Sequence, residues 1–282
     1  MNAPIHLAIV GEGSLVKSLR DHGAPLGRVR LMEALNPAAH AVLVDLPSGA
    51  RAGAVIAALR AGKIVLCPPP VALNEAELTA ITEAQRSGGG LLLPAGKIAH
   101  CEAGRHGMAA MAAPEFGALR SLYLAIRQPR GAGGDVIDDL LPEALDAVLA
   151  KVPGPFGAAR VNAGALFGAS RDTAIILLRA NAGVVVTMEL SRCLPPSMPA
   201  PGLGEVEIDA MGASQSVRIV PHAGAVRIHR DDGTAAVPWL DAPVLAMLRA
   251  LETAVDTPNA ASDGLTRAAR ALAVTQAIRA AL

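Results

Sequence analysis

Residues 6–16 carry the feature that most constrains the fold, an apolar run that passes through two glycines into a segment of helical spacing. Residues 6–10 read His-Leu-Ala-Ile-Val, Gly11 and Gly13 follow, and Leu15 and Leu19 lie four residues apart, as on one helix face. A strand, a tight glycine turn and a helix in this order form the unit that binds a dinucleotide pyrophosphate in many α/β proteins. The stretch therefore predicts a parallel α/β sheet with a phosphate-binding turn after its first strand.

The residues of this turn have separate roles in the predicted cofactor site. Gly11 allows the tight turn, and the missing side chain of Gly13 lets a phosphate approach the backbone. The N–H groups of Ser14 and Leu15 at the start of the helix face the negative charge. Val16 stands where the G-x-G-x-x-G pattern has a third small residue, so the match is partial. The alternative is a glycine turn that binds no ligand. If the turn does bind the cofactor, we expect Gly13→Leu to block dinucleotide binding and leave the fold intact.

An acidic residue follows the turn at the separation that ribose binding requires. Residues 28–33 read as a second strand that ends in Glu33, where a carboxylate can accept hydrogen bonds from the adenosine ribose. This position favours NAD as the cofactor. Arg28 and Arg30 keep NADP possible, because an arginine near this strand end could hold a 2′-phosphate; alternatively, Glu33 only ends a strand in solvent.

The spacing of apolar residues changes near residue 113, which divides the predicted elements into two groups. In the first group, strands alternate with helices, at 41–47, 50–61, 63–67, 74–87 and 91–93, with Asn74 as the N-cap of the second helix. In the second group, longer strands are joined by turn signals, at 119–126, 174–178, 184–190, 206–211, 217–220 and 225–229. Helices are predicted at 139–152 and as a pair over 242–282.

These elements predict an α/β chain of two domains. Residues 1–113 form an N-terminal Rossmann domain that binds the dinucleotide, and residues 114–282 form a C-terminal α+β domain with a large, mostly antiparallel open sheet. The bare face of such a sheet would expose apolar area to water. We therefore expect a homo-oligomer, a dimer or tetramer, that forms through the sheet of the second domain.

Composition argues against several other functional classes. Lys and Arg total 25, Asp and Glu total 25, and aromatic residues make up 2%, so the chain lacks the basic field and stacking surfaces of a nucleic-acid binder. The apolar runs are short and interrupted, so we expect no membrane partner. Cys67, Cys101 and Cys193 are widely spaced and fit reduced thiols in a cytoplasmic protein, and the scattered histidines predict no metal site.

Two passages in the first domain resemble a known family. Residues 44–48, Val-Asp-Leu-Pro-Ser, and residues 57–67, Ala-Ala-Leu-Arg-Ala-Gly-Lys-Ile-Val-Leu-Cys, are similar to the A-T-P-(N/S) and A-L-x-A-G-K-H-V-L-C-E-K-P segments of the Gfo/Idh/MocA family. That family is named after glucose-fructose oxidoreductase and inositol dehydrogenase. The similarity extends over nearly the whole chain, through residues 117–122, 133–135 and 262–278.

The resemblance implies both a fold and a chemistry. Proteins of this family join a Rossmann domain to an α/β domain with a large open sheet, and most oxidise or reduce a sugar-like hydroxyl or carbonyl with NAD(P). By position, it also implies that Leu46, Pro47 and Pro69 lie beside the cofactor. These assignments rest on the resemblance alone.

The sequence departs from the family pattern at its two chemical positions. Where the family has E-K-P, with a lysine that positions the substrate oxygen, this chain has Pro68–Pro69–Pro70. The second-domain pattern G-G-x-x-x-x-D-x-x-x-H-x-x-D corresponds here to Gly133, Gly134, Asp139, Glu143 and Asp146. Glu143 thus replaces the histidine that carries the proton, which argues against ordinary sugar-alcohol dehydrogenation.

Other residues could supply the acid–base group. Glu143 or Asp139 could act as a base if burial raised its pKa; alternatively, Asp139, Glu143 and Asp146 form a solvated acidic face. Lys97 and His100, in a segment that matches the family's N-R-R-F-H-P stretch, could donate a hydrogen bond; alternatively, they are a loop lysine in water and a packed histidine.

The sequence therefore predicts an NAD(P)-dependent oxidoreductase-like protein with altered acid–base residues. Its substrate would be an unidentified small molecule with an activated C=C, C=N or carbonyl bond that the enzyme reduces. The alternative is a catalytically silent NAD(P)-binding sensor, or an accessory subunit of another enzyme.

Overall fold

The structure is a computed structural model that describes residues 3–282 except 22–26, 34–35, 101, 132, 153, 198–203, 221–224, 231–232, 239–242 and 258–262. The chain forms two compact units: Met1–His100 with Ala242–Leu272, and Cys101–Asp241 with Ala273–Leu282. This division differs from the boundary expected after residue 113. Helix α5 (Glu102–Ala112) packs on strands of the second unit, and helix α8 (Pro243–Asp256) returns to the first.

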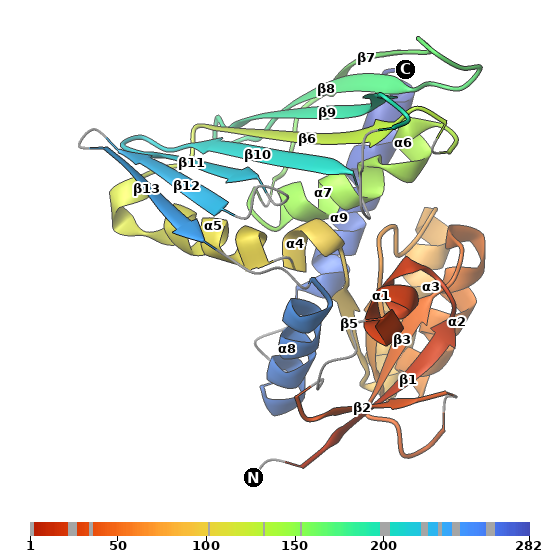
Figure 1. Cartoon of the computed structure of the whole chain (residues 1–282). Helices are drawn as coiled ribbons and strands as arrows, with labels where there is room; N and C mark the ends of the chain where they lie inside the picture. The colour runs from red at the N-terminus through yellow and green to blue at the C-terminus, as the bar shows by residue number, and fades with distance from the viewer. Residues whose placement is uncertain are drawn as a thin grey trace. The chain divides into compact units, whose positions relative to one another are not determined.

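The first unit is built on a five-stranded parallel sheet, drawn in Figure 1. Its strand order is β2-β1-β3-β4-β5, with β1 Ile5–Gly11, β2 Val29–Met32, β3 Ala41–Asp45, β4 Ile64–Cys67 and β5 Leu91–Pro94. All five residues of β3 are buried, as expected for the central strand of a parallel sheet covered on both faces. The helices of this unit are α1 (Ser14–Asp21), α2 (Ser48–Arg60), α3 (Glu75–Gly88), α4 (Lys97–His100) and α8.

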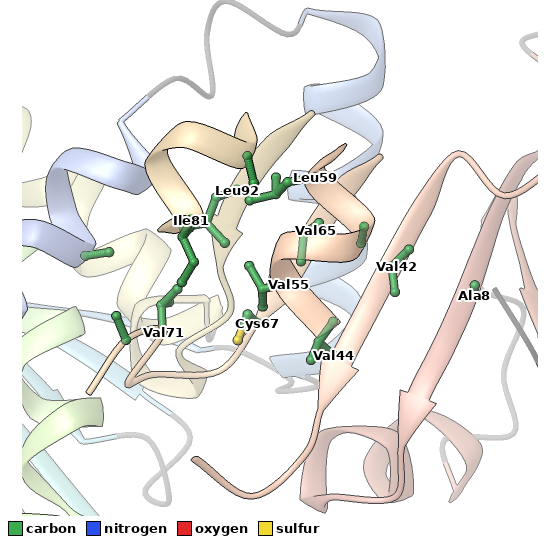
Figure 2. Close-up of a cluster of buried hydrophobic side chains, with 14 of the residues drawn as sticks. Ala8, Val42, Val44, Val55, Leu59, Val65, Cys67, Val71, Ile81 and Leu92 are labelled. Atoms are coloured by element: carbon green, nitrogen blue, oxygen red, sulfur yellow. The ribbon is translucent and has the colours of Figure 1, made fainter. Parts of the chain in front are cut away.

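Two apolar clusters cover the two faces of this sheet. In one, α1 and α8 contribute Leu15, Val16, Leu19, Met247, Leu248 and Leu251. In the other, Val55 and Leu59 of α2 and Ile81 of α3 pack with Val42 and Val65 of the strands, as Figure 2 shows. The predicted cap of α3 is confirmed, because the Asn74 side chain accepts the Glu77 N–H at 2.9 Å.

The second unit is built on an eight-stranded sheet of order β13-β12-β11-β10-β6-β9-β8-β7. Its strands are β6 Ser121–Pro129, β7 Arg160–Gly164, β8 Thr173–Arg179, β9 Val185–Leu194, β10 Glu205–Met211, β11 Ser216–Val220, β12 Ala225–Arg230 and β13 Gly233–Pro238. All neighbouring strands are antiparallel except β6 and β9. The predicted fold class, a Rossmann-like domain followed by a domain with a large, mostly antiparallel sheet, is confirmed.

Helices cover one face of the large sheet. Helix α5 packs on β11 and β12, while α6 (Val136–Asp139) and α7 (Leu141–Leu149) pack on β6, β8 and β9; Figure 1 shows these helices on the same side of the strands. The short turn η1 (Pro114–Phe116) precedes β6, and α9 (Gly264–Ala280) ends the chain's regular structure. Side chains on β8 alternate between buried and exposed along the strand, as a half-covered sheet requires.

Four segments differ from the sequence prediction. Strands β7 and β13 were not predicted, because their short, small-residue sequences lack a strong alternating pattern. The helix predicted at 139–152 is observed as α7 over Leu141–Leu149, and Asp139 is the last residue of the separate helix α6, with a break at Leu140 before Pro142. The segment with Lys97 and His100 is helix α4, which corrects the expectation of a loop.

None of the described helices combines the length and apolar character that a membrane span requires.

Candidate functional site

The predicted strand–turn–helix unit forms at residues 5–21. Strand β1 ends at Gly11, whose φ of +102° lies in a region that side chains rarely adopt. Helix α1 begins at Ser14, and the Gly13 N–H donates to the Asp45 carbonyl at 3.0 Å. Gly11 and Gly13 therefore shape the turn as the sequence predicted, at the carboxyl end of the central strands.

The side chain of Asp45, the last residue of β3, contacts the backbone at the start of α1. Its side chain is 4% exposed, and its Oδ2 atom accepts the N–H groups of Leu15 at 2.7 Å and Val16 at 3.0 Å. These donors belong to the first turn of α1, where N–H groups have no partner within the helix. Asp45 therefore caps α1 from a neighbouring strand of the sheet.

The same carboxylate explains why glycine stands at position 13. A Cβ at Gly13 would lie 2.2 Å from Asp45 Oδ1 and 2.5 Å from Asp45 Oδ2. A Cβ at Gly11 would lie 2.4 Å from the Asp45 carbonyl oxygen. The space that the predicted cofactor site reserves for a phosphate is filled by a side chain of the protein itself.

The described conformation does not fit a dinucleotide pyrophosphate at this turn. The pyrophosphate would need the N–H groups and the space that the Asp45 carboxylate holds. Sequence reasoning missed this residue because the buried strand 41–47 was assigned a structural role only. A signal was present: an acidic side chain at the end of a buried strand, at the alanine position of the A-T-P-(N/S) pattern.

The two arginines considered as holders of a 2′-phosphate are bound elsewhere in the first unit. Arg28 lies at the amino end of β2 and forms an ion pair with Asp256 at 2.6 Å. Arg30 donates to the carbonyl oxygens of Gly27 and Val29, both at 3.0 Å. Glu33 is exposed just beyond the carboxyl end of β2, and its contact with a ribose stays a prediction.

The residues that replace the E-K-P segment are held by Arg51 of α2. The Arg51 guanidinium donates to the carbonyl oxygens of Leu46 at 2.5 Å, Pro68 at 3.1 Å, Pro69 at 3.1 Å and Pro70 at 3.2 Å. Leu46 and Pro69 are half-buried, and Pro47 is exposed before α2. One cation therefore joins the ends of β3 and β4, at the edge of the sheet where parallel α/β folds bind ligands.

A buried thiol lies beneath this segment. Burial raises the pKa of Cys67 to about 12, with Arg51 opposing and Asp45 reinforcing the shift. At neutral pH the thiol is therefore protonated, and its Sγ donates to the Pro68 carbonyl at 3.4 Å.

Cys67 and Cys193 are free thiols, and Cys101 lies outside the described residues. Among the described residues, no group of His, Cys, Asp and Glu is arranged to hold a metal ion.

Lys97 and His100 lie on α4, in the first unit. Lys97 Nζ donates to Ser14 Oγ at 2.9 Å, which brings a cation to the first residue of α1. His100 is half-buried, and its Nε2 lies 2.8 Å from the Pro94 carbonyl oxygen. A carbonyl can only accept a hydrogen bond, so this contact selects the tautomer with the proton on Nε2. The structure thus joins Lys97 to the predicted phosphate turn.

Of the three acidic residues predicted to share a face, Glu143 and Asp146 are buried and Asp139 is exposed. Glu143 is 8% exposed and Asp146 is 3% exposed, both on α7. Asp139, at the end of α6, forms an ion pair at 2.7 Å with Arg192, which is itself buried. Arg192 also donates to the Gly134 carbonyl. Sequence reasoning missed Arg192, whose partners lie more than fifty residues away.

The uncovered face of the large sheet carries a polar network. Arg127 donates to Glu189 at 2.7 Å and to Glu207 at 3.2 Å, and Tyr123 donates to Glu189. Burial and the hydrogen bond to Glu189 raise the pKa of Tyr123 to about 12. The hydrogen bond from Arg127 lowers the pKa of Glu189. Apolar side chains are exposed on the same face: Ile175, Leu177, Val185 and Met211.

Solved oxidoreductases share the fold of the whole chain. An oxidoreductase from Agrobacterium radiobacter, crystallised with NAD+, L-tartaric acid and magnesium, is 12% identical with a TM-score of 0.80, over 99% of this chain and 96% of that chain. UDP-N-acetylglucosamine 3-dehydrogenase GnnA from Acidithiobacillus ferrooxidans is 20% identical with a TM-score of 0.77, over 100% and 98%. Levoglucosan dehydrogenase, in a complex with NADH and levoglucosan, is 15% identical with a TM-score of 0.80, over 99% and 97%.

Searches by sequence give a different result from the comparison of structures. No family model matches the chain, and no curated protein matches it. The relation to the solved structures is therefore carried by three-dimensional similarity at low identity. This protein has the fold of these oxidoreductases along its full length.

Proposed function

We propose that this chain is a divergent relative of the Gfo/Idh/MocA family, an NAD(P)-dependent oxidoreductase-like protein with altered acid–base residues. The observation that carries the proposal is a fold shared over 99% of the chain with oxidoreductases crystallised with NAD+ or NADH. The glycine turn of this chain at the end of β1 supports it. Glu33, exposed beyond β2, favours NAD. A cytoplasmic location with reduced thiols is part of the same proposal.

The substrate in this proposal is a small molecule with an activated C=C, C=N or carbonyl bond. Proline at position 69 offers no side-chain donor, so only Lys97 or His100 could stabilise the charge that develops on a plain ketone. Glu143, His100 and Lys97 are the candidate acid–base residues. Asp139 is a weaker candidate, because its carboxylate is already bound by Arg192. Its role in this proposal is to orient the loop before α6.

The first test is a calorimetric titration with NADH and NADPH, followed by turnover assays. We expect binding of NADH in preference to NADPH, and no oxidation of common polyols or aldoses with either cofactor. The missing donor at position 69 is worth about 3–4 kcal/mol, by analogy with the loss of one oxyanion-hole donor. Rapid oxidation of inositol or glucose would show that this reasoning about Pro69 is wrong.

The second test applies once a substrate has been found. We expect Glu143→Gln or His100→Ala to lower kcat at least about tenfold, the range for loss of an acid–base group. Glu83→Gln is the matched control, because Glu83 is an exposed carboxylate on α3 that pairs only with its neighbour Arg86 among the contacts described. Full activity in both variants would place the reacting groups elsewhere.

A silent sensor or accessory subunit is the second candidate function. One observation favours it: Pro69 and Glu143 stand where the family pattern has its lysine and its histidine. Under this alternative, binding persists without turnover of any substrate. In both cases we propose a homo-oligomer that buries the exposed apolar side chains of β8, β9 and β10 on the uncovered sheet face.

A further inference from the structure

The start of α1 is an anion site that the protein fills with its own side chain. One oxygen of Asp45 accepts two N–H groups of the first helical turn, at 2.7 Å and 3.0 Å. Asp45 is 4% exposed, so its carboxylate is shielded from water. Backbone donors and the helix dipole together stabilise a negative charge at such a place.

The fit around this carboxylate leaves no room for a second anion. The atoms of the Asp45 carboxyl group lie 2.2–2.5 Å from the position that a Gly13 Cβ would take. A phosphate that approached the backbone at Gly13 would therefore meet Asp45 first. The carboxylate and the phosphate need the same space as well as the same donors.

Because both are negatively charged, the Asp45 carboxylate and a pyrophosphate exclude each other from this position. A dinucleotide pyrophosphate carries negative charge, and like charges at contact distance in a buried site repel strongly. Lys97 supplies a cation nearby through its hydrogen bond to Ser14 Oγ, but that contact is on the exposed side of the turn. A cation at Ser14 can attract a phosphate without releasing the N–H groups of Leu15 and Val16.

We propose that Asp45 is a built-in competitor of the dinucleotide: the phosphates bind only after the Asp45 carboxylate has withdrawn from α1. This inference rests on the proposed function, because it takes NAD(P) as the ligand. The apparent affinity of the wild-type chain is reduced by the small fraction of molecules in which the carboxylate has withdrawn. A single substitution at Asp45 should therefore release a tighter site.

The experiment measures binding of two probes, NADH and inorganic pyrophosphate, by calorimetry on four proteins. Asp45→Ala removes the carboxylate and its charge from the start of α1. We expect this variant to bind both probes at least about tenfold tighter than the wild type. Asp45→Asn keeps an acceptor for the N–H groups but removes the charge, so its affinities should lie between the two. Glu12→Gln is the matched control, because it removes one exposed carboxylate from the same turn; its affinities should stay within about twofold of the wild type.

The two probes separate failure of this inference from failure of the proposed function. Tighter pyrophosphate binding by Asp45→Ala without NADH binding supports competition between Asp45 and phosphate groups at this turn, and it contradicts the proposal that NAD(P) is the cofactor. Equal NADH affinity in the wild type and Asp45→Ala overturns the inference that Asp45 competes with the dinucleotide, and it leaves the cofactor proposal intact. If neither protein binds either probe, both proposals are wrong. Should Asp45→Ala fail to fold, Asp45→Asn decides the question, and an affinity no higher than that of the wild type overturns the inference.

Discussion

Gly13→Ala is expected to lower the free energy of unfolding by at least about 3 kcal/mol, although alanine adds only a methyl group. The new Cβ would lie 2.2 Å from Asp45 Oδ1, so the carboxylate would have to move. Moving it deprives two buried N–H groups of their acceptor, at about 1–3 kcal/mol for an unsatisfied group, and adds overpacking of about 1–3 kcal/mol. Urea denaturation measures the loss. This changes the expectation from sequence that even Gly13→Leu would leave the fold intact.

A double-mutant cycle with Asp45→Ala tests the cause of this loss. In the Asp45→Ala background the alanine at position 13 has space, so Gly13→Ala should cost at least about 1 kcal/mol less than in the wild type. Gly49→Ala, in the first turn of α2, is the matched control, because a Cβ there would meet nothing within 4 Å. It should be neutral or slightly stabilising. Equal costs of Gly13→Ala in both backgrounds would show that Asp45 is not the obstacle.

Arg51→Ala is expected to destabilise the first unit by about 2–4 kcal/mol. The guanidinium is the donor to four carbonyl groups at the ends of β3 and β4, and hydrogen bonds from a charged donor contribute about 1.5–3 kcal/mol each when buried. The half-buried position of Arg51 lets water replace part of this loss. The three prolines supply no N–H groups that could compensate.

Two further variants make this prediction specific. Arg51→Lys keeps the charge, but an ammonium group cannot reach carbonyl groups at the ends of two strands as the planar guanidinium does. Its loss of stability should therefore be more than half of that of Arg51→Ala. Arg60→Ala removes an exposed arginine from the other end of α2 and should change stability by less than about 0.5 kcal/mol. If Arg51→Ala unfolds at the wild-type urea concentration, water satisfies these carbonyls and the guanidinium is dispensable.

The sequence predicted those parts of the fold that depend on neighbouring residues. The glycine turn, the cap at Asn74 and the change from alternating elements to long strands each lie within a short stretch, where local preferences decide the structure. Lys97 and His100 were placed in a loop because their helix is a single turn, too short for a periodic pattern.

The features that were missed join distant parts of the chain. Asp45 reaches Leu15 across thirty residues, because β1 and β3 are neighbours in the sheet. Arg192 reaches Asp139 across fifty-three residues. Glu143 and Asp146 are buried because α7 is buried on nearly all sides, whereas their charge alone predicts exposure. Local sequence contains no information on such pairings until the strand order is known.

The parallel pairing of β6 with β9 has a consequence for how the second unit is assembled. Strands β7, β8 and β9 follow one another as antiparallel neighbours, and so do β10 to β13, so each group can form from contacts close in sequence. Strand β6 alone joins the two groups, with β9 on one side and β10 on the other. Its partners are far along the chain, as the eighty residues between Arg127 and Glu207 show. Closing such long loops costs entropy before the contacts form. We therefore expect the pairing of β6 with β9 and β10 to form more slowly than the pairing within either group.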